Sequence, residues 1–367
     1  MATEYALTVT GQPYFTHTES RSIPAFYTIP DRGVTSSTGI LLLISGFEGD
    51  TSANVYKKMR MEFSDQQDLI VVQCDYFGFQ FMGSDTMLQV HQKMEDMVEE
   101  LNQHTDEIDT FMPEGMRDEL TLSETSDCFC ELGIFQALDN LRVLKKVMML
   151  LSEQGLEYNN NRIIAYGYSH GAYLSLLCNA FAPNLFSGIL DNSGWIYPVY
   201  LYRSRICSGK WSDSETQKSK MLYVFINYRG RSWIDDLEVY NLRRLYSQFE
   251  NHANILSFHG ENDGLVPLKE KVHFLEKVKN SRIYVVQEKD VDHKIFNNTQ
   301  HGMGSNFLAL FYFVSAIERF ERPEENKAAR EEKLWNFHSF SSRKYQYNIS
   351  SELEISRVPL SKLSLIL

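Results

Sequence analysis

The chain has 367 residues, of which 43% are hydrophobic, 13% aromatic and 23% charged. This is the composition of an ordinary globular protein, and it excludes a wholly disordered chain, a fibrous repeat and a coiled coil. The 48 acidic and 36 basic residues give a formal net charge of −12. Such a field repels phosphate backbones and anionic lipid headgroups, so we expect neither nucleic acid nor a membrane as a partner.

The five cysteines favour an intracellular protein. Their number is odd, and none of them forms a CxxC pair or has the spacing of zinc ligands. The first residues, MATEYALTVTGQPYF, lack the basic and then apolar layout of a signal peptide. The apolar run FLALFYFVSAI is far shorter than the roughly 20 residues that a membrane-spanning helix needs. The sequence therefore predicts a cytoplasmic protein.

Strand and helix patterns alternate along most of the chain. Polar and apolar residues alternate within residues 5–29, which predicts an opening antiparallel hairpin. Short apolar runs, typical of strands buried on both faces, are GILLLIS (39–45), LIVVQCDYFG (69–78), RIIAYGY (162–168), SGILDNSG (187–194), NILSFHG (254–260) and RIYVVQ (282–287). Helical periodicity occurs at about 53–67, 131–154, 170–181, 267–279 and 305–320. Because strands that alternate with helices need crossover connections, we predict an α/β fold: a mostly parallel central sheet with helices on both faces.

Two stretches interrupt this rhythm and predict insertions, at about 79–130 and 195–253. The first is acidic and partly helical, and the second begins with the aromatic run WIYPVYLY and contains a predicted helix at about 235–250. Residues 1–320 are thus expected to form one α/β domain in which the insertions serve as lids. The charged and then alternating residues of 321–367 predict a C-terminal extension.

The sequence GYSHG carries the sharpest chemical signal. It lies directly after the strand RIIAY and before the helical run AYLSLLCNAF, the context in which a GxSxG match is a nucleophile elbow. The turn is so tight that bulky residues two positions on either side of the serine would collide, which explains Gly167 and Gly171. Ser169 is therefore the candidate nucleophile.

A serine hydroxyl is a weak nucleophile, so a base and an orienting acid must follow. The string HGENDGLVP comes after the strand NILSF, and an aspartate on the loop that leaves a parallel strand lies at the ligand-binding edge of the sheet. Asp263 is the candidate acid, and its alternative role is to cap the next helix. Asp191, at the end of the preceding strand, is the second candidate acid.

Two histidines follow the last predicted strand and are candidates for the base. His301 is followed by glycines and stands immediately before the apolar final helix, the usual position for such a base. His293 lies a few residues earlier, in DVDHKIF, and is the second candidate. We expect His301 to reach Ser169.

The oxyanion that forms in such a reaction needs backbone N–H donors. One is expected from His170, the residue after the nucleophile, and the other from the turn after GILLLIS, where Phe47 is the best candidate. The side chain of His170 is expected to pack elsewhere.

In this order, GYSHG on a strand-to-helix turn, HGENDGLVP after a later strand and His301 before the last helix resemble the α/β-hydrolase superfamily. The HGxxDxxVP pattern is similar to that of prolyl-oligopeptidase-type and acyl-esterase-type members. The resemblance covers roughly residues 35–320 and implies an α/β-hydrolase fold, a Ser169–Asp263–His301 triad and acyl-enzyme chemistry. The whole chain is also similar to an uncharacterised bacterial α/β-hydrolase family whose genes often lie near surface-glycan modification genes.

The resemblance departs at the oxyanion turn, which reads SGFEGD rather than the HGGG of many lipases and esterases, so a lipase-like role is not carried over. It favours a serine hydrolase that cleaves a carboxylic ester, with a small-molecule or glycan ester such as a carbohydrate acetyl or acyl ester as substrate. An O-acyltransferase with the same triad, and a non-catalytic hydrolase-fold binding or assembly protein, are the alternatives; a peptidase is a weaker one. No GxxxxGK[ST], HExxH, GxGxxG or EF-hand motif occurs, so no cofactor and no metal is expected. The oligomeric state is left open.

Overall fold

The computed structural model divides the chain into two compact units. The residues that it describes are 1–15, 19–103, 115–214, 216–323 and 327–363. Unit 1 comprises Met1–Phe77, Gly133–Pro198 and Asp236–Leu367, and unit 2 comprises Gly78–Leu132 and Val199–Asp235. Among the described residues, none of the helices combines the length and the apolar character that crossing a bilayer requires.

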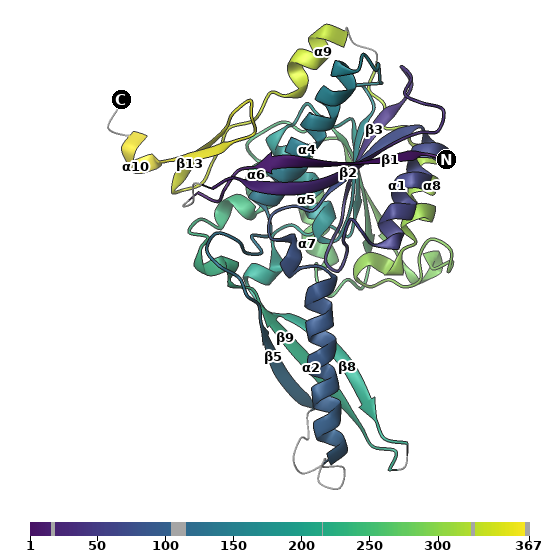
Figure 1. Cartoon of the computed structure of the whole chain (residues 1–367), viewed down its shortest axis with the longest axis vertical. Coiled ribbons are helices and arrows are strands. Elements are labelled where there is room, and N and C mark those ends of the chain that lie inside the picture. Colours follow the sequence, from purple (N-terminus) through teal and green to yellow (C-terminus); the bar gives the residue numbers. More distant parts are fainter. Residues whose placement is uncertain (16–18, 104–114, 215, 324–326, 364–367) are drawn as a thin grey trace. The chain divides into compact units, whose positions relative to one another are not determined.

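An eight-stranded sheet forms the centre of unit 1 (Figure 1). Its order is β1-β2-β4-β3-β6-β7-β10-β11. The strands are β1 (Thr3–Gly11), β2 (Arg21–Ile29), β3 (Gly39–Ile44), β4 (Leu69–Cys74), β6 (Ile163–Tyr168), β7 (Gly188–Asn192), β10 (Asn254–Gly260) and β11 (Ser281–Val286). The pairs β1–β2 and β2–β4 are antiparallel, and every pair from β4 to β11 is parallel. The predicted α/β fold with a mostly parallel sheet is therefore confirmed.

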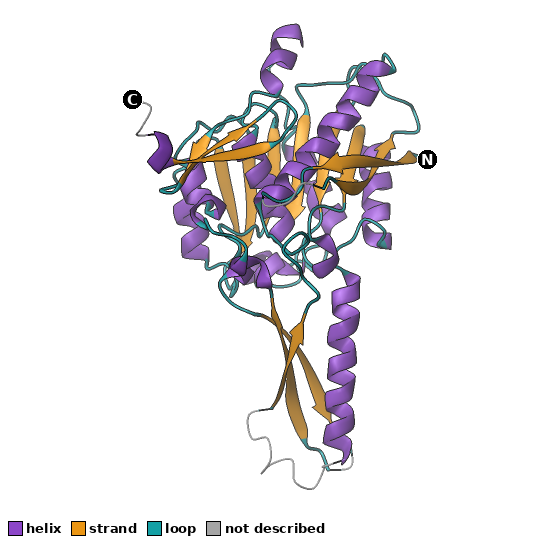
Figure 2. Ribbon diagram, turned by 60° about the vertical axis from the view of Figure 1, so that its left-hand side comes forward, coloured by secondary structure: helices purple, strands orange, loops and turns teal. Residues whose placement is uncertain are grey.

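Helices cover both faces of this sheet (Figure 2). The helices of unit 1 are α1 (Asn54–Gln67), α4 (Ile134–Glu153), α5 (His170–Phe181), α6 (Leu242–Tyr246), α7 (Leu268–Leu275), α8 (Phe307–Ile317), α9 (Lys327–Leu334) and α10 (Leu360–Leu363), with the short 3₁₀ turns η4 (Glu238–Tyr240), η5 (Glu288–Asp290) and η6 (His301–Gly304). Of these, α9 and α10 belong to the C-terminal extension and do not cover the sheet. On one face, apolar side chains of β3, β4, β6, β7 and β10 form a single cluster with α1 and α8. On the other, α4 and α5 pack together and contact β3 and the neighbouring strands. Burial on both faces explains why these strands are mainly apolar.

Residues 236–253 and the C-terminal residues belong to unit 1. The helix α6 packs against α5, where the hydroxyl of Tyr246 donates to the carbonyl of Leu176. A small sheet of β12 (Phe340–Ser341), β13 (Tyr345–Ile349) and β14 (Ile355–Pro359) follows α9. The ring of Phe340 stacks on that of Phe181 in α5, with centroids 5.2 Å apart. The extension predicted from the sequence is thus packed on the same helix as α6.

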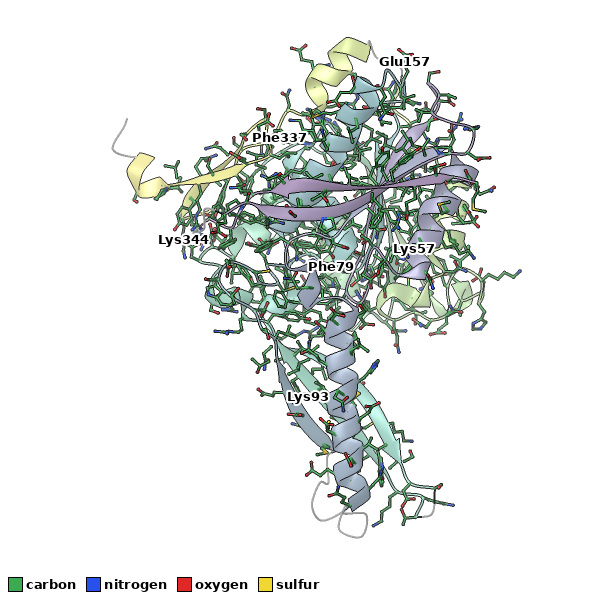
Figure 3. All side chains as sticks on the ribbon, viewed as in Figure 1. Lys57, Phe79, Lys93, Glu157, Phe337 and Lys344 are labelled. Atoms are coloured by element: carbon green, nitrogen blue, oxygen red, sulfur yellow. The ribbon has the colours of Figure 1, made fainter. Side chains whose placement is uncertain are left out.

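Unit 2 contains one long helix and a three-stranded sheet. The helix is α2 (Ser84–Gln103), the sheet has the order β5 (Met116–Thr121), β9 (Ser219–Asn227), β8 (Arg205–Ser212), and the 3₁₀ turns are η1 (Phe79–Phe81), η2 (Val199–Leu201) and η3 (Arg229–Ser232). Lys93 on α2, labelled in Figure 3, forms an ion pair of 2.6 Å with Asp118 on β5. The indole N–H of Trp211 on β8 donates to Asn102 on the same helix. The lid role of the insertions stays a prediction.

Candidate active site

Ser169 is the single residue between β6 and α5. Its backbone has φ 54° and ψ −115°, a conformation that L-residues rarely adopt. Strain of this kind costs roughly 1–3 kcal/mol and persists only where the surrounding structure enforces it. The turn places the serine hydroxyl at the carboxyl edge of the sheet, beside the first backbone N–H groups of α5.

The two glycines of GYSHG are required by close backbone contacts. A Cβ atom at Gly167 would lie 2.2 Å from the carbonyl carbon and oxygen of Gly171. A Cβ atom at Gly171 would lie 2.2 Å from the carbonyl oxygen of Ile44 in β3. The glycine spacing therefore reflects how tightly β6, α5 and β3 meet at the turn.

We expect Gly167→Ala to lower the free energy of unfolding by about 3 kcal/mol, near the upper end of the usual cost of over-packing. Gly264→Ala is the matched control, because a Cβ atom there would meet nothing within 4 Å. We expect the control to change stability by no more than about 0.5 kcal/mol. Urea denaturation followed by circular dichroism measures both, and equal stability of the two variants would contradict the close-contact explanation.

The structure brings Ser169, His301 and Asp263 together. The distance from Ser169 Oγ to His301 Nε2 is 2.8 Å, and that from His301 Nδ1 to Asp263 Oδ2 is also 2.8 Å. The carboxylate of Asp263 is fully buried, whereas 21% of the His301 side chain is exposed. These contacts join three elements that lie far apart in the sequence: the elbow after β6, the loop after β10 and the turn η6 after β11.

Four N–H groups lie close to the carboxylate of Asp263: two from the backbone and one each from the imidazoles of His301 and His259. Its Oδ1 accepts the backbone N–H groups of Leu265 and Val266, just before α7. Burial alone would raise the pKa of Asp263, but the hydrogen bond and charge of His301, together with these N–H groups, lower it overall. The carboxylate therefore orders the start of α7 and holds His301 at the same time.

His301 lies in an irregular turn that the sequence explains. Gly302 has φ 74°, and a Cβ atom there would lie 2.3 Å from the hydroxyl oxygen of Tyr168. The N–H of Gly302 donates to Ser193 Oγ after β7, at 3.1 Å. The turn is thus fastened directly beside the imidazole.

The second candidate base, His293, is exposed and has φ 55° in a separate turn. In that turn the carboxylate of Asp292 accepts the N–H groups of Lys294, Ile295 and Phe296. These hydrogen bonds lower the pKa of Asp292 from 3.8 to about 2. His293 is not the histidine that the structure places on Ser169.

Asp292→Ala is expected to lower the urea midpoint at pH 7. A carboxyl group whose pKa is lowered on folding stabilises the protein above its unfolded pKa, and this contribution is lost as the pH falls through the folded value. The difference between wild type and variant should therefore shrink below about pH 4 and vanish near pH 2. Lys294→Ala, the neighbouring control, should show no such pH dependence, and a difference that stays constant with pH would contradict the assignment.

The second candidate acid, Asp191, is occupied elsewhere. Its Oδ2 lies 2.6 Å from Lys271 Nζ, and its Oδ1 accepts the N–H of Gly194 at 2.7 Å. The carboxylate that contacts His301 is that of Asp263. The structure therefore places Asp263, and not Asp191, in the position of the orienting acid.

The expected oxyanion donors lie on both sides of Ser169. The N–H of His170 is the first of α5, and such groups have no partner within the helix. The turn that contains Phe47 also comes close, because a Cβ atom at Gly46 would lie 3.6 Å from Ser169 Cβ. Two tyrosines fasten this turn: Tyr76 donates to the carbonyl of Ser45 at 2.8 Å, and Tyr56 hydrogen bonds to the backbone of Gly46. The donor roles of Phe47 and His170 stay proposals.

The side chain of His170 turns into the interior of unit 1. Burial lowers its pKa to about 3, and its Nε2 lies 2.6 Å from Gln136 Oε1. Its ring packs against those of Phe47 and Trp195, with centroids 5.5 and 4.9 Å away. A neutral, packed imidazole of this kind supports the turn rather than exchanging protons at neutral pH.

Sequence reasoning missed several residues that support the site. Tyr56 and Tyr76 stand within ordinary helix and strand-end patterns, so nothing in the sequence singles them out. His259 is the first residue of the HGENDGLVP motif, so the sequence did point to it, but no role was predicted for it. Lys271 is buried in α7, and a buried lysine has no sequence signature.

Within the described residues, no three His, Cys, Asp or Glu side chains are grouped so that they could hold a metal ion.

The sheet order, the strained serine between β6 and α5, and the positions of Asp263 and His301 define an α/β-hydrolase fold. This is the fold that the sequence motifs implied. A family model described as "Protein of unknown function (DUF2920)" matches residues 79–331, and the chain belongs to this family.

The chain is similar to several solved structures that are distant from it in sequence. No curated protein matches the sequence significantly. Est1E from Butyrivibrio proteoclasticus with bound ferulic acid is 11% identical, with 81% of this chain and 94% of that chain covered and a TM-score of 0.45. The acylaminoacyl peptidase of Pyrococcus horikoshii is 14% identical, with 90% and 44% covered and a TM-score of 0.48. A fungal esterase from Rhizomucor miehei is 10% identical, with 87% and 83% covered and a TM-score of 0.47.

Proposed function

We propose that the protein is a serine hydrolase that cleaves carboxylic esters through an acyl-enzyme on Ser169. The observation that carries this proposal is the unbroken chain of contacts from Ser169 Oγ through His301 to Asp263, each 2.8 Å long, at a strained elbow. Backbone strain of this kind at a candidate nucleophile is typical of functional sites. The arrangement serves nucleophilic catalysis, in which a base activates the hydroxyl and an acid holds the base.

In the proposed reaction, His301 Nε2 takes the hydroxyl proton while Ser169 Oγ attacks the ester carbonyl. The negative charge on the carbonyl oxygen is held by the N–H groups of Phe47 and His170. Ionised Asp263 stabilises the imidazolium that forms. His301 then gives the proton to the leaving alcohol, and the acyl-enzyme remains on Ser169. In the second half, His301 takes a proton from water while the water oxygen attacks the acyl carbonyl. The carboxylic acid product then leaves, and His301 returns the proton to Ser169.

A carbohydrate acetyl or acyl ester is the proposed substrate, on the strength of the sequence resemblance alone. An O-acyltransferase would use the same triad and differ only in whether a sugar hydroxyl or water accepts the acyl group. Release of acetate without any acceptor favours the hydrolase, and retention of the acyl group until a glycan is added favours the transferase. The cytoplasmic location and the lack of nucleic-acid and membrane partners stay predictions.

The test combines an active-site probe with simple substrates. The wild-type chain is treated with a fluorophosphonate and assayed on p-nitrophenyl esters of increasing acyl length, with Ser169→Ala as the blank. Ser351→Ala, an exposed serine in the turn between β13 and β14, is the matched control. We expect labelling and turnover in wild type and control but not in the blank. No labelling combined with no turnover would overturn the proposal in favour of a non-catalytic binding protein.

A further inference from the structure

Three ionisable side chains that the proposed reaction does not use are buried close to Asp263. They are His259 on β10, Asp191 on β7 and Lys271 on α7, and each side chain has 0% exposure. Asp191 is in register with Ser257, two residues before His259, so Asp191 and His259 point to the same face of the sheet. This face is the one that α7 covers with Lys271.

Lys271 and Asp191 form an ion pair, and both side chains also hydrogen bond to the backbone of Gly194. The ammonium lies 2.6 Å from Asp191 Oδ2 and donates to the carbonyl of Gly194 at 2.8 Å. The N–H of Gly194 in turn donates to Asp191 Oδ1 at 2.7 Å. Burying two charges is costly, and well-packed apolar residues in their place are often equally stable or more stable. A gain in stability is therefore a weak explanation for this ion pair, so we consider a role at the candidate active site.

His259 contacts the candidate acid and lies on the sheet face that it shares with Asp191. Its Nε2 lies 2.8 Å from the carbonyl oxygen of Val266, so this nitrogen carries the proton, and it also lies 3.4 Å from Asp263 Oδ2. Burial lowers the pKa of His259, the charge of Lys271 lowers it further, and the charges of Asp263 and Asp191 oppose this. These three are the charged groups that face it from α7, its own loop and β7. The outcome is a neutral N–H donor beside Asp263.

We propose that His259, whose Nε2 contacts both the carbonyl oxygen of Val266 and Asp263 Oδ2, is a positioning residue for Asp263. The inference rests on the proposed function, in which the charge of Asp263 serves His301. Were His259 to become protonated, Asp263 would have two cationic partners, and the support that it gives to the imidazolium of His301 would be divided. Burial opposes this protonation first, and the like charge of Lys271 adds to it. Asp191 makes the burial of that lysine tolerable.

The protonation of His259 can be measured without any activity. In ¹⁵N-labelled wild type, we expect the neutral His259 imidazole to carry its proton on Nε2 and to titrate below the ordinary range of a histidine. His259→Gln identifies its resonances among those of the ten histidines. Titration of His259 within or above that ordinary range in wild type would overturn the inference, whether or not the chain hydrolyses esters.

Removing the ion pair tests the cause. Lys271→Met leaves Asp191 without its cation. Of the variants tested, it should give the largest rise in the pH at which His259 titrates. Lys271→Met combined with Asp191→Asn removes both charges, keeps an acceptor for Gly194, and should give a smaller rise. We expect the pH at which His259 titrates to rise from wild type to the double variant and again to the single variant. Unchanged titration of His259 in the double variant would overturn the inference.

The positioning role is tested on p-nitrophenyl acetate. Glutamine at position 259 can present an N–H near the place of Nε2, whereas leucine cannot. We expect His259→Leu to lower kcat about tenfold to a hundredfold with KM little changed, the range that a small misplacement costs, and His259→Gln to recover most of it. In Lys271→Met the acid limb of the pH profile should move to lower pH with a reduced plateau. Equal kcat in the Leu and Gln variants would overturn the positioning role, while absence of turnover and of probe labelling in wild type would overturn the proposed function instead.

Discussion

Replacing Ser169 or His301 with alanine is expected to lower kcat for p-nitrophenyl acetate by about 10⁶-fold, and replacing both should lower it no further. Each substitution removes one partner of the 2.8 Å contact between Oγ and Nε2. Without the imidazole, the hydroxyl loses its proton acceptor, and without the hydroxyl, the imidazole has nothing to activate. The effects are therefore not additive, because the two side chains act as one unit.

The measurement is kcat for the two single variants and the double variant, with His293→Ala as the matched control. His293 is the exposed histidine of the neighbouring turn, so its loss should leave kcat within a factor of about two. If His301→Ala and Ser169→Ala retained more than a hundredth of the wild-type activity, or if their losses multiplied in the double variant, the contact would not be the catalytic one.

The central sheet could be predicted because its strands are buried on both faces. GILLLIS and LIVVQC are almost entirely apolar, and β3 and β4 are buried at every position. The helix predicted at about 235–250 is instead η4 followed by the short helix α6, because Asn241 accepts the N–H of Arg243 and begins a new helix there. A cap inside a helical pattern is a local event that periodicity does not reveal.

Unit 2 was harder to predict. The strand β5 reads MRDELT and the strand β8 reads RICSGKWS, and both alternate charged or polar residues with a few apolar ones. Such strands depend on their neighbour β9 and on the helix α2. For β5 the distant partner is β9, and for β8 it is α2. The sequence therefore predicted insertions here but no individual strand.

The candidate nucleophile could be predicted because a motif fixes the backbone around it. The choice between two candidate acids and two candidate bases could not, because it depends on side-chain contacts. GYSHG sits on a turn whose geometry demands its glycines, so Ser169 could be singled out. The choice of Asp263 over Asp191 depends on which carboxylate Lys271 neutralises, and that lysine reaches Asp191 from α7. The choice of His301 over His293 depends on the turn that Gly302 and Ser193 fasten. Neither contact leaves a trace in sequence spacing.

Replacing Asp263 with asparagine is expected to lower kcat by about 10⁴-fold while leaving the fold intact, the size of effect known for this change in other triads. The amide oxygen of asparagine can still accept the N–H groups of Leu265 and Val266, so its NH₂ group faces His301 Nδ1. An NH₂ donor requires an unprotonated Nδ1, which forces the proton onto Nε2. In that tautomer His301 cannot take the proton of Ser169.

Asp263→Ala separates this tautomer effect from simple loss of structure. Alanine leaves both N–H groups at the start of α7 without their acceptor, so its thermal midpoint should fall below that of the asparagine variant. The asparagine variant should instead melt close to wild type and show, by ¹⁵N NMR, the proton of His301 on Nε2 with Nδ1 bare. If the asparagine variant kept the wild-type tautomer and still lost activity, Asp263 would act by its charge alone. If it kept its activity, the carboxylate would serve only to order the start of α7, and the acid of the triad would have to be sought elsewhere.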